Sequence, residues 1–316
     1  MSALTFTQRP ECISCASTRL STVWSTSYRN LDVERYMDRY GYAVDWRAEL
    51  ADSPIELAQC SDCETIFHQN ILDAESLGTL YSDWIDEDQI DTLTDDVHAD
   101  SAAAVQFENA RKHVRHILRL NRLLRKQFGR DAAPWRVLDF GCGAAEFLKQ
   151  ASLFGFATWG VDFSSTRASQ ALNQQISIIP SLDAYNESAS EPVHAITLFQ
   201  VLEHLDAPRR TLLDLAEVIA EGGILIIEVP NCSSDHTGAP RSFEEFRNVH
   251  PLEHINAFTP ESLTKLVEST GFVKINPGPA HVTYRPDALI KSELTRFYEP
   301  PRTNQYFRKG SPSRVA

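Results

Sequence analysis

Signals for strands and helices alternate through the second half of the chain, and this alternation restricts the possible folds more than any other feature. Amphipathic stretches typical of helices separate short apolar runs typical of strands. Strands that alternate with helices form a mostly parallel sheet covered on both faces. We therefore predict an α/β fold whose ligands bind at the carboxyl ends of the strands. The predicted strands lie at 136–140, 157–161, 176–179, 195–199, 224–229 and 272–275.

Composition and pattern along the sequence divide the chain into four predicted segments. Residues 1–80 hold two cysteine pairs and form a small zinc-ribbon-like N-terminal module. Residues 81–104 are strongly acidic and form a linker or a lid, either as solvated surface or as a strip that steers a cationic ligand. The main domain spans 105–298 and opens with an amphipathic helix. Residues 299–316, rich in Pro, Arg and Ser, are expected to be a mobile tail.

Charge and hydropathy argue against two classes of partner. The chain has 30 Lys and Arg against 43 Asp and Glu, a net charge of −13, whereas nucleic-acid binding depends on basic surfaces. No apolar run approaches the roughly 20 residues that cross a bilayer, and the first residues lack the apolar segment of a signal peptide. We expect no nucleic-acid or membrane partner and a cytoplasmic location.

Four of the six cysteines form two C-x2-C pairs, Cys12 with Cys15 and Cys60 with Cys63. Two such pairs can supply the four thiolates of a tetrahedral Zn²⁺ site, and four sulfurs leave no position for a substrate. The alternative is two independent turns with unliganded thiols. We predict a structural zinc ion, whose loss unfolds the N-terminal module first.

Two glycines, Gly141 and Gly143, stand directly after the first apolar strand. Glycine allows a sharp turn and lets a ligand approach the N–H groups at the start of a helix. A dinucleotide fingerprint would need a small residue at position 146, which is Glu146, so an oxidoreductase that uses NAD is disfavoured.

The stretch 137–148 resembles motif I of the class I S-adenosylmethionine (SAM)-dependent methyltransferases. The resemblance continues at 160–164, 198–208 and 221–231 and covers about residues 105–285. It implies a Rossmann-like, mostly parallel sheet of seven strands with SAM as cofactor. Two departures are Ala145 in place of the usual third glycine and Val193-His194 in place of the common Phe-Asp.

The resemblance also implies where the cofactor binds. Asp162 would accept hydrogen bonds from both ribose hydroxyls, as acids about 20 residues past the glycines do in related folds. Asp139 and the glycine loop would hold the methionine part, the main chain of Gln200 would face its amino group, and the residues after the third strand would lie by the adenine. The implied cofactor residues are Asp139, Gly141, Cys142, Gly143, Asp162, Phe163, Ser181, Leu182, Asp183 and Gln200.

Methyl transfer usually needs a base that deprotonates the acceptor, and histidine has a suitable pKa. His204 follows the fourth strand, and His250, Glu253 and His254 lie between the fifth strand and a helix that starts at Thr259. A structural role for His204 is an equal alternative. We take His254, Glu253, His250 and His204 as the candidate catalytic residues, with His254 as the first candidate for the base.

A cysteine module, a methyltransferase core and a Glu-His pair before Phe258 together look like the zinc-containing sugar C-methyltransferases and their relatives. Those enzymes carry Tyr-x-Glu-His, whereas this chain has Pro251 in place of the tyrosine. C-methylation of a nucleotide-linked ketosugar and O-methylation of a sugar or other small hydroxylated intermediate both fit. The expected partner is therefore a small-molecule substrate.

Two further alternatives concern the role of the site. Glu203, His204 and His250 or His254 could bind a metal ion, which is similar to some RNA-terminal methyltransferases, but Gln200 replaces a carboxylate that such a site needs. The protein could also bind SAM without catalysis, as a scaffold in a biosynthetic complex.

Overall fold

The computed structural model describes residues 4–40, 42–85, 102–162, 176–188, 191–233, 249–278, 280 and 303–310. The chain divides into two compact units. Unit 1 comprises residues 1–104, 202–208 and 230–265, and unit 2 comprises residues 105–201, 209–229 and 266–316. Residues 86–101 of the predicted linker or lid lie outside the described residues, and its last three residues begin helix α5 (Ala102–Phe128). Unit 1 also contains two segments, 202–208 and 230–265, that the sequence had placed in the main domain.

Unit 2 contains a sheet of seven strands in the order β12-β13-β10-β9-β6-β7-β8. The five strands from β10 to β8 are parallel, and β13 runs antiparallel to both of its neighbours. The predicted α/β fold with a mostly parallel sheet is thus confirmed. The strands are β6 (Arg136–Phe140), β7 (Ala157–Val161), β8 (Ser177–Ile179), β9 (Val193–Phe199), β10 (Ile219–Glu228), β12 (Phe272–Ile275) and β13 (Asn304–Lys309).

Strand β13 corrects the prediction of a mobile tail. Asn304–Lys309 pairs with β10 on one side and β12 on the other, and Gln305, Tyr306 and Phe307 are buried. The sequence predicted six strands, and this is the seventh. The Pro, Arg and Ser residues that suggested a mobile tail flank a short segment whose aromatic side chains enter the core.

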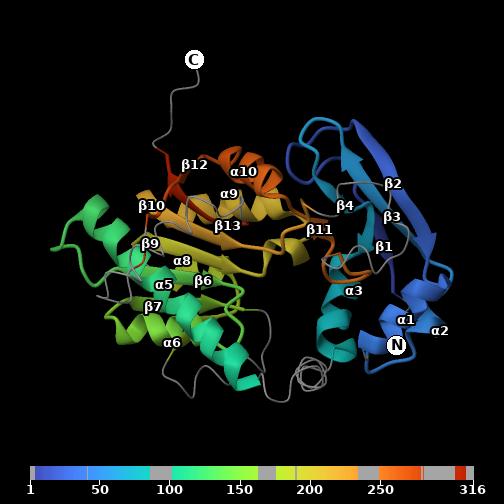
Figure 1. Cartoon of the computed structure of the whole chain (residues 1–316), viewed down its shortest axis with the longest axis horizontal. Helices are drawn as coiled ribbons and strands as arrows, with labels where there is room; N and C mark the ends of the chain where they lie inside the picture. The colour runs from blue at the N-terminus through green and yellow to red at the C-terminus, as the bar shows by residue number, and fades with distance from the viewer. Residues whose placement is uncertain are drawn as a thin grey trace, which may run out of the picture. The chain divides into compact units, whose positions relative to one another are not determined.

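Helices pack against the sheet of unit 2 because successive strand residues point to opposite faces. Val137 and Ile226 of the sheet form one core with Leu120 of α5 (Ala102–Phe128) and Phe147 of α6 (Glu146–Leu153). Figure 1 shows these two green helices along the same side of the sheet. Among the described residues, α8 (Leu182–Ser188) and nearly all of α9 (Pro208–Val218) also belong to unit 2. Helix α10 (Pro260–Glu268) begins in unit 1 and ends in unit 2. Within the described residues, no helix combines the length and apolarity needed to span a membrane.

Unit 1 contains an antiparallel sheet in the order β11-β4-β3-β2 and a separate β1-β5 pair. Its main core joins Tyr28, Met37, Trp46 and Trp84, so the aromatic residues between the cysteine pairs supply much of the packing. The elements of unit 1 are β1 (Phe6–Gln8), β2 (Leu20–Ser27), α1 (Leu31–Tyr40), α2 (Trp46–Leu50), β3 (Pro54–Cys60), β4 (Ile66–His68), β5 (Asn70–Leu72), α3 (Ala74–Thr79), the π-helical turn η1 (Leu80–Trp84), the 3-10 turn η2 (Leu202–His204) and β11 (Asn256–Ala257).

Candidate functional site

The glycine loop after β6 has the backbone that the sequence predicts. Gly141 and Gly143 have φ values of 73° and 51°. A Cβ atom on Gly141 would lie 2.5 Å from Val201, so a larger residue does not fit. Ala145 has a φ of 60° and directly precedes α6. Alanine therefore takes the left-handed conformation that glycine adopts more easily, and the loop keeps its course toward the start of the helix.

Asp139 lies near the end of β6 and is buried at 3% exposure. Its Oδ1 accepts a hydrogen bond of 2.6 Å from Thr197 on the adjacent strand β9. Burial raises the pKa of Asp139 to about 7, against the opposing effect of the Thr197 hydroxyl. A cationic group brought to this carboxylate would favour its ionised form.

The other predicted cofactor residues of unit 2 lie at the same edge of the sheet, where the parallel strands end. Asp162 follows β7 directly and accepts a hydrogen bond of 2.8 Å from the main-chain N–H of Gly143. Ser181 precedes α8 and caps it by accepting from the N–H of Ala184, with Leu182 and Asp183 in the first turn. Phe163 lies outside the described residues, and Cys142 is buried beside Gly160.

Gln200 follows β9 with a φ of 57°, and its N–H donates to the carbonyl of Glu228 at 2.8 Å. The Glu228 carboxylate forms an ion pair with Lys112 and accepts a hydrogen bond from the Asn304 amide. The sequence analysis did not predict these contacts. Burial alone would raise the pKa of Glu228, but the nearby His116, whose Nε2 lies 3.8 Å from Oε2, and the hydrogen-bonded Lys112 lower it to about 2. Helical periodicity placed Lys112 and His116 on α5 but did not show which face meets β10.

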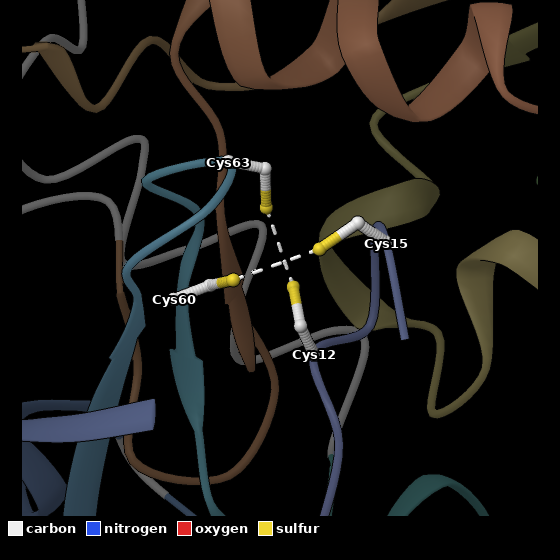
Figure 2. A group of neighbouring side chains, drawn as sticks. All are labelled: Cys12, Cys15, Cys60 and Cys63. Carbon is white, nitrogen blue, oxygen red and sulfur yellow. Dashed lines mark hydrogen bonds between the residues drawn. The ribbon is translucent and has the colours of Figure 1, made fainter. Parts of the chain in front are cut away.

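The four N-terminal cysteines form one cluster in unit 1. Figure 2 shows their sulfurs pointing toward a common centre from two turns. The Sγ–Sγ distances are 3.4 Å for Cys12–Cys63 and 3.6 Å for Cys15–Cys60. Four sulfurs about 2.3 Å from one zinc ion stand about 3.8 Å apart in a tetrahedron, so the cluster fits Zn²⁺.

Without an ion, the cysteines of the cluster differ in acidity. A hydrogen bond from Cys12 lowers the pKa of Cys63 to about 4, although burial opposes it. The same hydrogen bond, together with burial, raises the pKa of Cys12, and burial raises that of Cys15. Main-chain N–H groups also donate to sulfur within each turn, from Ser14 to Cys12 and from Asp62 to Cys60, each at 3.4 Å. Such N–H donors stabilise the anionic form that a metal requires.

The predicted catalytic residues meet in unit 1 as a histidine stack. The rings of His250 and His254 lie parallel, with centroids 3.8 Å apart, and His204 stands edge-on to His254 at 4.6 Å. Burial, together with the neighbouring histidines, holds the pKa of His250 well below its usual value, so this ring is neutral. The structure thus brings together the three histidines that the sequence selected.

Glu253 is buried and faces two phenols that the sequence analysis did not assign to the site. Tyr40 and Tyr42 donate to its two oxygens at 2.6 and 3.0 Å. Burial raises the pKa of Glu253, and these two hydrogen bonds limit the rise. Tyr36, one helical turn before Tyr40 on α1, packs on His250 with centroids 5.4 Å apart. The i, i+4 spacing of Tyr36 and Tyr40 indicated that these two rings share one face of a helix, but it did not connect them with Glu253.

Comparisons with known proteins give a match to one protein family and to several solved structures. A family of methyltransferase domains matches residues 110–276, more than half of the chain. The plantazolicin methyltransferase BamL, solved with a triazolic desmethylPZN analog and S-adenosylhomocysteine (SAH), is 14% identical over 74% of this chain and 94% of its own, with a TM-score of 0.49. The plantazolicin methyltransferase BpumL is 17% identical over 74% and 95%, with a TM-score of 0.45.

The N-methyltransferase NodS from Bradyrhizobium japonicum WM9 is 17% identical over 61% of this chain and 86% of its own, with a TM-score of 0.37. No curated protein matches the chain. The matched residues 110–276 include the glycine loop and every strand of the parallel part of the sheet. The chain therefore belongs to the family of methyltransferase domains, and its seven-stranded sheet is that of the class I SAM-dependent enzymes.

Proposed function

We propose that this protein transfers a methyl group from SAM to a small hydroxylated acceptor, such as a nucleotide-linked sugar or another biosynthetic intermediate. The half-buried histidines and tyrosines around the buried Glu253 carry the proposal, because methylation of oxygen or carbon needs a group that takes a proton. In sequence, Glu203 and His204 follow β9 and the 250–254 segment follows β10. Loops after the strands of such sheets build the ligand sites.

The chemistry of methyl transfer assigns a different role to each group of residues. SAM supplies an electrophilic methyl group, and the transfer is an in-line displacement that depends on alignment of the acceptor. In the proposal, Asp162, Gly143, Asp139 and the Gln200 main chain bind the cofactor. The histidine cluster accepts the acceptor proton, and Glu253, held by its phenols, fixes the acceptor in place.

The phenols of Tyr40 and Tyr42 bear on the choice of acceptor. Pro251 stands where the sugar C-methyltransferases carry a tyrosine, and Tyr28 donates to its carbonyl at 3.1 Å. Tyr40 and Tyr42 bring hydroxyl groups to Glu253 from the N-terminal module instead. Their presence supports a polyhydroxylated acceptor and keeps both C- and O-methylation of a sugar within the proposal.

The test uses the full chain with methyl-labelled SAM and a panel of nucleotide-linked sugars, ketosugars and small phenols. We expect acceptor-dependent formation of SAH, with NMR of the product assigning the new bond to carbon or oxygen. His254→Ala should slow turnover by about 100-fold or more with SAM affinity intact. Tight SAM binding without SAH formation for any acceptor would favour the scaffold alternative. Binding of NADH with no response to SAM would reject the proposal.

A further inference from the structure

A second group of ligating side chains lies in unit 1, apart from the four cysteines. One carboxylate oxygen of Glu203 and one ring nitrogen each of His204 and His254 lie within 4.8 Å of one another. A shared ion about 2.1 Å from each atom would place them within about 4.2 Å of one another. Small side-chain rotations therefore suffice to bring all three onto one ion.

The chemistry of the three groups points to a particular class of ion. Two imidazoles and one carboxylate suit divalent first-row transition metals, whereas Mg²⁺ and Ca²⁺ prefer oxygen ligands alone. Glu203 is only 1% exposed. A carboxylate that is so deeply withdrawn from water is costly unless positive charge or hydrogen-bond donors compensate it, and a divalent cation provides that charge directly.

The turn that carries Glu203 and His204 is held in place by a buried amide. The Nδ2 group of Asn256 donates to the carbonyls of Leu202 and Leu205, at 2.8 and 2.7 Å. These carbonyls flank the two ligands in sequence. The single side chain of Asn256 thus fixes the whole η2 turn from β11, two residues after His254.

A buried arginine supports that amide. Arg9 donates to Oδ1 of Asn256 at 2.8 Å and to the carbonyls of His68 and Ile255. Asn256 and Arg9 are both buried. Ligands that are held by supporting hydrogen bonds before the ion arrives are the mark of a preorganised site.

Outer groups surround the imidazoles as they do in metal sites. The hydroxyl of Tyr81 lies 3.3 Å from Nδ1 of His204, which leaves Nε2 of that ring for the ion. The ring of His250 stacks on that of His254. The main-chain N–H of His250 donates to the main-chain carbonyl of His254 at 3.2 Å. Within the described residues, the buried Nδ1 atom of His250 makes no hydrogen bond, so it is open to a water molecule or a ligand.

We propose that Glu203, His204 and His254 bind a divalent transition-metal ion such as Mn²⁺, Fe²⁺, Co²⁺ or Zn²⁺, separate from the zinc ion of the cysteine cluster. The sequence argument against such a site was Gln200. In unit 2 the Gln200 amide donates to Glu228 at 3.3 Å, so this residue is engaged elsewhere. The three remaining ligands are enough for one ion with positions left open.

The open positions suggest what the ion does. An acceptor hydroxyl bound there would have a lower pKa and would lose its proton more easily. His254 would then act on the acceptor through the ion. This catalytic use rests on the proposed function, whereas binding of the ion does not.

Titration of the metal-free full chain with Co²⁺ tests the site. Wild type should bind two equivalents, one with the strong sulfur-to-cobalt charge-transfer band of the cysteine cluster and one with only weak ligand-field bands. Glu203→Gln and His254→Gln should keep the first and weaken the second by about 100-fold or more, since even outer-shell changes cost 10- to 100-fold. Glu253→Gln is the matched control, because that neighbouring carboxylate is not among the three ligands, and it should bind both ions.

SAM affinity and thermal unfolding, measured on each variant, show that the fold is intact. A wild-type protein that binds a single equivalent would overturn the inference. So would a Glu203→Gln protein that binds the second ion as tightly as wild type. Turnover is measured on the same samples: a protein that holds the second ion but methylates nothing would count against the proposed function and leave the metal site standing.

Discussion

The carboxylate of Asp162 accepts a hydrogen bond of 2.8 Å from the main-chain N–H of Gly143, 19 residues earlier in the chain. This bond ties the end of β7 to the glycine loop after β6. The two cofactor elements that the sequence motifs proposed are therefore one connected surface of unit 2. A change at Asp162 should disturb the loop as well as the ribose contacts that we propose for this carboxylate.

Asp162→Ala should weaken SAM binding by roughly 10- to 150-fold, since hydrogen bonds to a charged group contribute about 1.5 to 3 kcal/mol. Isothermal titration with SAM and SAH measures the loss. Asp214→Ala is the control, because the side chain of Asp214 is partly exposed and forms a surface i, i+4 pair with Arg210 on α9. Equal SAM affinity in Asp162→Ala and wild type would show that the ribose binds elsewhere.

SAM binding should also depend on pH through Asp139. Burial raises the pKa of this carboxyl to about 7 in the free protein. The cationic methionine part favours the ionised form, so binding releases a proton wherever free Asp139 is protonated. Affinity should fall as the pH drops below 7, by up to about tenfold per pH unit.

Calorimetry at pH 6 in buffers of different ionisation enthalpy measures the released proton. Asp139→Asn removes the titrating group, so its SAM affinity should be lower than that of wild type at pH 8 and nearly independent of pH. A wild-type affinity that stays constant between pH 5 and pH 8 would contradict the placement of Asp139 at the cofactor.

Loss of one cysteine ligand should unfold unit 1 before unit 2. Each unit has its own core, and the proposed structural zinc site lies in unit 1, so its loss should act on that unit first. Cys60→Ser should bind no zinc at the cluster and show an early unfolding transition by calorimetry. Cys232→Ala changes a buried thiol of the same unit outside the cluster, and its zinc content should equal that of wild type. A single unchanged transition in Cys60→Ser would show that the zinc has no structural role.

The phenols on Glu253 should matter for turnover. Tyr40→Phe removes the 2.6 Å hydrogen bond to Glu253, and loss of about 1.5 kcal/mol of positioning would slow turnover by roughly tenfold. Tyr28→Phe is the matched control, since its hydroxyl donates only to the Pro251 carbonyl. Both variants are measured for SAH release under saturating SAM. Equal rates in Tyr40→Phe and wild type would remove Tyr40 from the site.

Local sequence patterns predicted the parts of the fold that depend on neighbouring residues. The ranges of β6, β7 and β12 agree with the apolar runs at 136–140, 157–161 and 272–275. Strand β13 was missed because its pairing with β10 joins residues about 80 positions apart, and six residues flanked by polar sequence give little periodic signal.

In the candidate site, too, local motifs predicted some residues, whereas contacts between distant parts of the sequence were missed. The motifs found His204, His250 and His254, since each lies close to a recognisable strand or helix start. The phenols on Glu253 come from residues 211 and 213 positions earlier in the chain, and no spacing rule connects positions so far apart. Only the folded structure shows that the aromatic residues between the cysteine pairs supply hydrogen bonds to this carboxylate.

Ionised Glu228 should add to the free energy of unfolding of unit 2, and this contribution should be lost at acidic pH. Its pKa is about 2 in the folded protein because the neighbouring His116 and Lys112 outweigh burial, whereas an unfolded glutamate has a pKa of about 4.3. A lowered pKa stabilises the fold above the unfolded value, and this contribution, about 3 kcal/mol, disappears as the pH falls from 4.3 to 2. Glu228→Gln should therefore be less stable than wild type in urea at pH 7, and the difference should shrink toward pH 3.

Glu221→Gln, on the same strand, is the control for this prediction. It changes a half-exposed carboxylate paired with Lys309 and should alter stability by less than about 1 kcal/mol at either pH. A difference between Glu228→Gln and wild type that is equal at both pH values would mean that the network stabilises the protein through packing rather than through charge.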